Sequence, residues 1–201
     1  MKKIFSLCLI TVISFLLLPG CITTHEQRLK ELEARVAKLE KYVEPLVAAQ
    51  TKKDNIAHFK EAAKQRMLAD LKAYSPQQLR IAEKLYQSQG LKWKSPEKTE
   101  KLKEVLKRYP KSNRAGCAAL YLGQTSKGLE QIKYLKLAVE KYSDCFYGDG
   151  VQVGPYAQYC LILIYTKSGK KEEAKRLAQE LKERYPNAID HRQRVLSKLL
   201  K

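Results

Sequence analysis

The sequence predicts an all-α protein: an N-terminal coiled-coil helix, then an α-solenoid of about three helix pairs, and a C-terminal capping helix. Three observations lead to this prediction. Apolar residues follow a heptad spacing early in the chain, helix-start signals recur after residue 75, and one helix ending occurs three times. The alternative is an unrelated helical bundle whose periodicity is accidental.

The first 21 residues have the composition of a bacterial export signal. A short basic stretch precedes a mostly apolar run, residues 4–18, which is shorter than the ~20 residues that a membrane-spanning helix needs. The run ends in Leu18-Pro19-Gly20-Cys21, which resembles the bacterial lipobox, although Pro19 stands where that family usually has Ala or Ser. The alternatives are an ordinary secretory signal or an uncleaved anchor, with the cysteine incidental.

The lipobox resemblance implies a lipid anchor at Cys21. It implies that residues 1–20 are a cleaved signal peptide, that Cys21 becomes the diacylglyceryl-modified, acylated N-terminus, and that residues 21–28 form a short tether. Several acyl chains hold a protein stably on a membrane, because each buried methylene contributes ~0.8 kcal/mol. Ile22 stands where the family's inner-membrane retention signal has Asp, so we expect an outer-membrane location facing the periplasm.

Residues 29–50 are predicted to form the coiled-coil arm. Apolar residues recur there with spacings of three and four, at Leu29, Leu32, Val36, Leu39, Val43 and Leu46. This is the heptad seam through which helices of separate chains associate. Arg28 and Arg35, at position g, would each face a glutamate at position e of a parallel neighbour. We therefore expect a homo-oligomer, either a dimer or a trimer; the alternative is one amphipathic helix packed on its own domain.

Pro45 is expected to interrupt the coil or to open a new helix, and residues 51–74 are expected to form a linking helix. From residue 75 to residue 201 the pattern changes to helix pairs. Ser75-Pro76 and Ser95-Pro96 each place an N-cap residue before a proline at the first helical position. The expected helices of this region span 76–88, 96–109, 112–125, 128–142, 154–168, 170–185 and 188–200.

Three of these helices end alike, at Tyr109, Tyr142 and Tyr185, with apolar residues four and seven positions earlier. These offsets keep one face of each helix apolar. The first two tyrosines are 33 residues apart and the last two are 43 apart, with the excess in a Gly-containing loop. A unit near 34 residues that is built from two helices resembles the tetratricopeptide repeat, most clearly between Tyr156 and Pro186.

The order of coiled coil and repeats resembles two families of envelope proteins. One is the periplasmic cell-division coordinator of the Tol–Pal system, which has an oligomerising coil before its repeats but is not usually lipidated. The other is the repeat lipoprotein of the outer-membrane β-barrel assembly machine, which shares the anchor but lacks the heptad segment. Both resemblances imply an envelope scaffold that binds a protein partner in the groove of its repeats. Neither supplies individual functional residues.

The charge balance narrows the expected partners. The chain has 39 Lys and Arg against 21 Asp and Glu, a formal net charge of +18. Export removes nucleic acid from reach, so anionic lipid, cell-wall polymer or acidic protein become the expected counterparts. Salt-sensitive binding of such a polymer or lipid is the alternative function, and simple solvation of helix surfaces is the alternative meaning of the charge. No metal-ligand spacing, cofactor loop or catalytic motif occurs in the sequence, so we expect neither a cofactor nor an enzyme.

Three cysteines remain if Cys8 is removed and Cys21 is acylated. Cys117 and Cys160 fall on equivalent helices of neighbouring repeats, so a disulfide between them is possible in an oxidising compartment. The preferred interpretation is that Cys117, Cys145 and Cys160 are small buried hydrophobes.

The loop after Tyr142 is the first candidate for a functional surface, because inserted loops often lie at binding faces. Its expected contact residues are Tyr147, Asp149 and Gln152. The alternative is a structural insertion whose Val151 and Val153 pack onto the adjacent helices. The loop follows no predicted strand, which argues against a phosphate-binding cradle.

Overall fold

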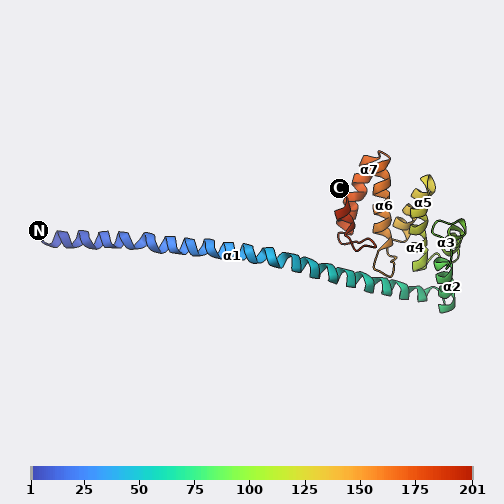
Figure 1. Cartoon of the computed structure of the whole chain (residues 1–201), viewed down its shortest axis with the longest axis horizontal. Coiled ribbons are helices and arrows are strands. Elements are labelled where there is room, and N and C mark those ends of the chain that lie inside the picture. The colour runs from blue at the N-terminus through green and yellow to red at the C-terminus, as the bar shows by residue number, and fades with distance from the viewer. Residues whose placement is uncertain (1, 201) are drawn as a thin grey trace. The chain divides into compact units, whose positions relative to one another are not determined.

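The computed structural model describes the backbone of residues 2–200 and the side chains of residues 24–200. Regular structure among these residues is helical, and the extended pairing consists of two isolated β-bridges. The all-α fold class is therefore confirmed (Figure 1). In chain order the elements are α1 (Lys2–Ala69), the 3-10 helix η1 (Asp70–Lys72), α2 (Pro76–Gln87), α3 (Pro96–Arg108), α4 (Asn113–Thr125), α5 (Gly128–Lys141), α6 (Val153–Lys167), α7 (Lys171–Arg184) and the 3-10 helix η2 (Leu196–Leu199).

The chain divides into two compact units between Lys52 and Lys53, and α1 contributes to both. This helix continues through Pro45, so the interruption expected there is wrong. The residues around Pro45 are exposed, so water can hydrogen-bond the carbonyl oxygen that loses its partner when proline replaces an N–H donor. The stretch expected to link the coil to the repeats is the continuation of the same helix.

The predicted heptad positions of α1 are uncovered in the single chain. The exposed fraction of their side chains runs from 47% at Leu29 to 70% at Leu46. Self-association through these positions stays a prediction, and the Cys21 side chain lies outside the described side chains. Within residues 24–200, no helix is both long enough and apolar enough to cross a membrane.

Three helices of the second unit, α2, α3 and α4, begin at serine caps. The Ser75 hydroxyl accepts a hydrogen bond from the Gln78 N–H, and the Gln78 side chain accepts one from the Ser75 N–H. Ser95 caps α3 and Ser112 caps α4 in the same way, through a backbone N–H three residues later. Each bond satisfies a donor that the first turn of a helix cannot pair internally. The two predicted Ser-Pro starts are therefore confirmed.

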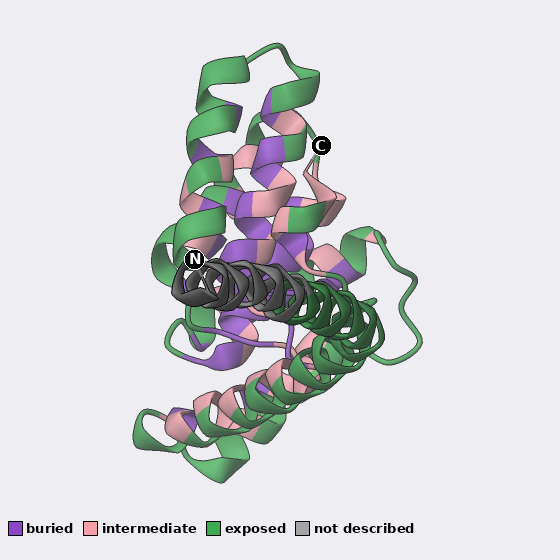
Figure 2. Cartoon of the chain, turned by 90° about the vertical axis from the view of Figure 1, so that its left-hand side faces the viewer, coloured by how far each residue is buried: buried purple, intermediate pink, exposed green. Residues whose placement is uncertain are grey.

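Helices α2 to α7 pack against their neighbours along the chain, and the first helix of each pair also contacts the next, α2 with α4 and α4 with α6. Figure 2 shows buried residues gathered between these helices and exposed residues at the turn from α6 to α7. The predicted apolar face is buried at five of its six positions, with Ala178 half-buried: Leu102, Val105, Leu135, Ala138 and Leu181 are fully buried.

Helix α4 is the centre of this body, with ten of its thirteen residues buried. It is rich in Ala and Gly because its neighbours approach closely. A Cβ atom at Gly116 would lie 2.5 Å from the Cβ of Cys145, and one at Gly123 would lie 2.6 Å from Cδ2 of Leu135. Small side chains at these positions therefore set the distance between α4 and the segments packed on it.

The loop between α5 and α6 is a hairpin that recurs after α7. In the first copy the Cys145 N–H donates to the Tyr142 carbonyl, and the Val153 N–H donates to the Cys145 carbonyl. In the second copy, 43 residues later, the Ala188 N–H donates to the Tyr185 carbonyl and the Leu196 N–H to the Ala188 carbonyl. A β-bridge closes each hairpin, Phe146 with Gln152 and Ile189 with Val195. The loop residues that lengthen the interval between Tyr142 and Tyr185 are thus part of a repeated element.

The expected capping helix over 188–200 is wrong. Its first half forms the second hairpin, and only Leu196–Leu199 are helical, as the 3-10 helix η2. The Asp190 carboxylate accepts hydrogen bonds of 2.9 Å from the N–H groups of both Arg192 and Arg194. These bonds hold the turn in a non-helical conformation that competes with helix formation, and Gln193 adopts a positive φ of 59°.

A buried polar cluster ties the end of α1 to the body. The Asp70 carboxylate accepts hydrogen bonds from the Asn113 N–H, at 2.8 and 3.0 Å, and from Arg66 at 2.6 Å. Arg66 also donates to Asp144, at 2.9 Å. The Asn113 amide continues the cluster, because it donates to the Phe146 carbonyl and accepts from the Phe146 N–H, both at 2.8 Å. Asn113 therefore joins η1, α4 and the hairpin.

Candidate functional site

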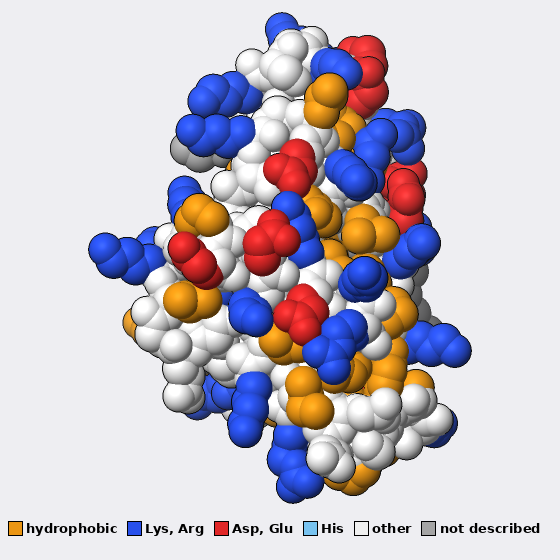
Figure 3. Space-filling model, turned by 90° about the vertical axis from the view of Figure 1, so that its right-hand side faces the viewer, with side chains coloured by type: hydrophobic (Ala, Val, Ile, Leu, Met, Phe, Trp, Pro, Cys, Tyr) orange, Lys and Arg blue, Asp and Glu red, His pale blue; other side chains and the backbone are white. Residues whose placement is uncertain are grey.

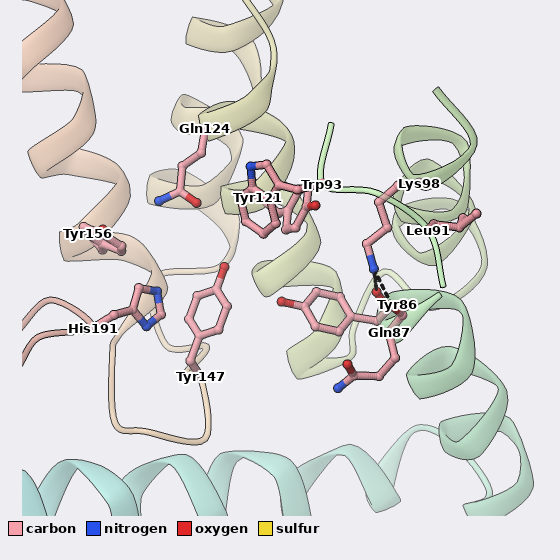
Figure 4. Close-up of a pocket in the computed structure, with 10 residues that line it drawn as sticks. All are labelled: Tyr86, Gln87, Leu91, Trp93, Lys98, Tyr121, Gln124, Tyr147, Tyr156 and His191. Atoms are coloured by element: carbon pink, nitrogen blue, oxygen red, sulfur yellow. Dashed lines mark hydrogen bonds between the residues drawn. The ribbon is translucent and has the colours of Figure 1, made fainter. Parts of the chain in front are cut away.

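The described body contains a cleft of about 750 Å³ lined mainly by aromatic side chains (Figure 4). Its residues come from the first helix of each of the three pairs, from α3 through Lys98, and from the loops and hairpins between and after the helices. The volume lies in the range of sites that hold small ligands or peptide segments. The lining residues are Tyr86, Gln87, Leu91, Trp93, Lys98, Tyr121, Gln124, Tyr147, Tyr156 and His191.

The aromatic rings form two groups on either side of the cleft. On one side Trp93 lies against Tyr121, with ring centroids 3.9 Å apart. On the other side the His191 ring meets Tyr147 and Tyr156 edge-on, with centroids 4.8 and 5.4 Å away. Trp93 keeps 59% of its side chain exposed even though it packs on Tyr121. Large rings of this kind offer apolar contact area at a low cost in conformational entropy.

Lys98 supports one end of the cleft. Its Nζ donates to the last carbonyl oxygens of α2, those of Tyr86 and Gln87, the second at 2.6 Å. It also lies 5.6 and 5.7 Å from the ring centroids of Tyr86 and Tyr121. Burial lowers the pKa of the Lys98 ammonium. Because a cation at a helix C-terminus satisfies carbonyl groups that the helix leaves free, Lys98 positions α2 against α3.

The Tyr121 hydroxyl is a buried polar group without a hydrogen-bond partner among the described residues. Its side chain is 5% exposed, and the backbone N–H of Lys94 approaches the oxygen without meeting hydrogen-bond geometry. Leaving such a group unpaired costs about 1–3 kcal/mol. The Tyr121 hydroxyl is therefore a donor that a ligand in the cleft could satisfy.

The predicted loop residues reach the cleft unequally. Tyr147 lines it and donates its hydroxyl proton to the Cys117 carbonyl, at 3.2 Å. Asp149 touches only the edge, through a 2.7 Å contact with Nδ1 of His191. Burial raises the pKa of Asp149, but hydrogen bonds from His191 and from the Val151 N–H outweigh it and bring the pKa below its usual range. Gln152 lies outside the cleft, where its amide donates to the Ser143 carbonyl.

The structural alternative for the loop is confirmed for its valines. Val151 and Val153 are both fully buried. The loop thus has two roles: its valines pack into the body while Tyr147 faces the cleft.

The possible disulfide between Cys117 and Cys160 is not formed; all three described cysteines are free thiols. Cys117 and Cys145 are buried, as the preferred interpretation held, and Cys160 is half-buried. Burial raises the pKa of Cys117 and Cys145 to about 12 and that of Cys160 to about 11. The description of these cysteines as small hydrophobes is accurate for the first two.

We expect these thiols to resist alkylation in the folded protein, because the thiolate is the reactive form. At mildly alkaline pH a thiol with a pKa near 12 holds roughly a thousandfold less thiolate than a free cysteine. Peptide mass spectrometry after brief iodoacetamide treatment should find Cys160 modified before Cys117 or Cys145, and all three modified rapidly in denaturant. Rapid modification of Cys117 in the native protein would contradict this account.

Most residues of the cleft were not predicted from the sequence. Tyr86, Trp93 and Tyr121 were not expected to be site residues, although Leu91 and Trp93 offered one signal, as two large apolar residues in a short polar loop. Among residues 24–200, no group of three or more His, Cys, Asp or Glu side chains could hold a metal ion.

Charges of both signs are mixed on the face of the molecule that Figure 3 shows. Figure 3 shows Lys and Arg side chains spread over the visible face, with Asp and Glu between them and apolar side chains in a band. Ten ion pairs between Lys or Arg and carboxylates are found among the described residues. A binding site for an anionic polymer would concentrate unpaired cations along one stripe, and the face in Figure 3 shows no such stripe.

Comparison with protein-family models, with curated proteins and with solved structures finds no match for this chain. The geometry of the cleft and the chemistry of its residues therefore carry the functional argument.

Proposed function

We propose that the protein is a non-catalytic adaptor of the bacterial envelope, anchored by a lipid on Cys21, which binds a segment of a protein partner in the aromatic cleft. One observation carries this proposal. The first helices of three successive pairs converge on one cleft, to which they contribute Tyr86, Tyr121 and Tyr156.

Three properties of the cleft support binding of a partner. Tyrosine and tryptophan dominate the energetics of protein interfaces, since they bury a large area with few rotatable bonds. Contacts between the first helices resemble those of stacked helical repeats, whose concave faces bind extended or helical segments. Finally, the unpaired Tyr121 hydroxyl is a group that a ligand could satisfy.

The heptad face of α1 adds a second part to the proposal. We propose that two or three copies associate through it, so that several clefts are presented by one anchored assembly. Covering six exposed apolar side chains would stabilise such an assembly. Several copies would also raise the effective affinity for a partner that carries repeated binding segments.

Position-specific photocrosslinking in intact cells tests the proposed function. A photoreactive phenylalanine analogue is placed at position 93 or 156 in the full-length, lipidated protein, with Lys175 as the control position. Lys175 is exposed on α7 and lies outside the cleft. We expect one protein adduct of defined mass from both cleft positions and none from position 175. Equal adducts at all three positions, or adducts at position 175 alone, would overturn the proposal.

A further inference from the structure

We infer that the segment bound in this cleft is an acidic, proline-rich stretch of the partner in the extended polyproline-II conformation. The inference rests on the proposed function and specifies its ligand. It follows from two unsatisfied donors in the cleft, from its rings, and from the charge at its rim.

The cleft lining contains no carboxylate, and two of its hydrogen-bond donors have no partner among the described residues. None of the ten lining residues is Asp or Glu. The carboxylates near lining residues are already paired: Asp149 with His191, Glu83 with Arg114 and Asp190 with Arg194. Free donors remain in the indole N–H of Trp93, which has no hydrogen-bond partner among the described residues, and in the Tyr121 hydroxyl.

These two unsatisfied donors fit a ligand that presents free acceptors. Proline has a carbonyl oxygen and no N–H. In the polyproline-II conformation the carbonyls make no internal hydrogen bonds, so they are free to accept from Trp93 and Tyr121.

The rings supply the apolar part of the recognition. Polyproline-II segments dock in aromatic-lined grooves, where pyrrolidine rings pack against Tyr and Trp and little conformational entropy is lost. Here two groups of rings stand on opposite sides of the cleft, Trp93 with Tyr121, and Tyr147 with Tyr156 (Figure 4).

The rim of the cleft is positively charged beside its most exposed ring. Lys92 and Lys94 flank Trp93 in the loop between α2 and α3, and both are exposed. Neither is in an ion pair with a described residue. Acidic residues next to the prolines would complement these two cations, and this contribution would weaken as salt increases.

The single tryptophan of the chain is Trp93, so intrinsic tryptophan fluorescence reports directly on the cleft. The mature full-length protein in detergent is titrated with an acidic peptide that contains a run of prolines. The control peptide has the same charges, with Gly and Ser in place of the prolines. We expect a saturable change in emission with the proline peptide, at a concentration about tenfold lower than any change with the control.

A pair of conservative variants separates binding from folding. Tyr121→Phe removes the unpaired hydroxyl and is expected to lower the affinity for the proline peptide about fivefold. The thermal stability of this variant should be unchanged or raised. Tyr134→Phe makes the same change outside the cleft and should leave the titration unaltered. Unequal stability of the two variants would be seen in parallel melting curves.

Two results would overturn the inference: equal titrations with the proline peptide and its control, or a stronger response to a soluble cell-wall oligosaccharide than to either peptide. Photocrosslinking to a protein through positions 93 and 156, together with either result, would leave the proposed function standing and reject only the proline-rich ligand. Failure of the crosslinking itself would reject the proposed function.

Discussion

Replacing Asn113 with alanine is expected to lower the free energy of unfolding of the body by about 3 kcal/mol. The side chain is 1% exposed and forms two 2.8 Å hydrogen bonds with the backbone of Phe146. Alanine leaves the Phe146 N–H buried without a partner and leaves its carbonyl only the weak Cys117 thiol donor, at 3.4 Å. An unsatisfied buried group costs about 1–3 kcal/mol. The melting temperature should fall by roughly 10 °C.

Asn187→Ala is the matched control for this prediction. Asn187 follows Tyr185 in the turn that leads into the second hairpin, but its side chain is exposed. We expect a change within about 0.5 kcal/mol there, as for most surface substitutions. Chemical denaturation of both variants measures the difference. Equal losses in the two variants would show that Asn113 does not join the hairpin to α4.

Replacing Cys21 with serine is expected to abolish lipid attachment completely. Lipidation requires a sulfur nucleophile, and a serine hydroxyl is far less nucleophilic than a thiol. Cells grown with a clickable fatty acid should incorporate label into the wild-type protein and none into the variant. Because anchoring by acyl chains scales with the number of buried methylenes, the loss of label measures the loss of the anchor.

Cys8→Ser controls for this experiment, because it changes a cysteine of the same segment that is expected to be removed with the signal peptide. Its label should equal that of the wild type. Label that persists in Cys21→Ser, or that disappears in Cys8→Ser, would contradict the proposed anchor at Cys21.

The helices of the body were predictable because their signals are local. Ser75 and Ser95 satisfy the first N–H groups of their own helices, and the apolar offsets before Tyr109 repeat along one helix face. Each signal lies within a few residues of the boundary or face that it determines. The predicted ends of α2 to α7 therefore fall within about two residues of those in the structure, inside the usual uncertainty of such boundaries.

The cleft was not predictable because its residues meet only after the helix pairs pack. Tyr86, Tyr121 and Tyr156 are 35 residues apart in sequence, and nothing local distinguishes them from core tyrosines such as Tyr109. Trp93 joins them from the loop between α2 and α3. The position of this loop depends on Lys98 of α3, whose Nζ donates to the Gln87 carbonyl at the end of α2. Sequence spacing predicts the elements, whereas the contacts between elements create the site.

The prediction of a capping helix over residues 188–200 is wrong for a different reason. Apolar residues from Val195 to Leu200 match a helical face, yet the Asp190 carboxylate stabilises a competing turn through the backbone of the four residues after it. That turn is equivalent to the hairpin after α5, which was interpreted as an insertion. The recurrence at 43 residues was visible only between the two tyrosines, so the second hairpin was interpreted as helix.

The central claim is that the cleft is where the partner binds, and one measurement tests it most directly. The partner segment captured through position 93 is titrated calorimetrically against the wild-type protein, Trp93→Ala and Leu129→Ala. Leu129 is 87% exposed on α5 and lies outside the cleft. We predict that Trp93→Ala raises Kd at least about tenfold, as for an interface hot spot, and that Leu129→Ala changes it less than about twofold. An unchanged Kd for Trp93→Ala would contradict the account.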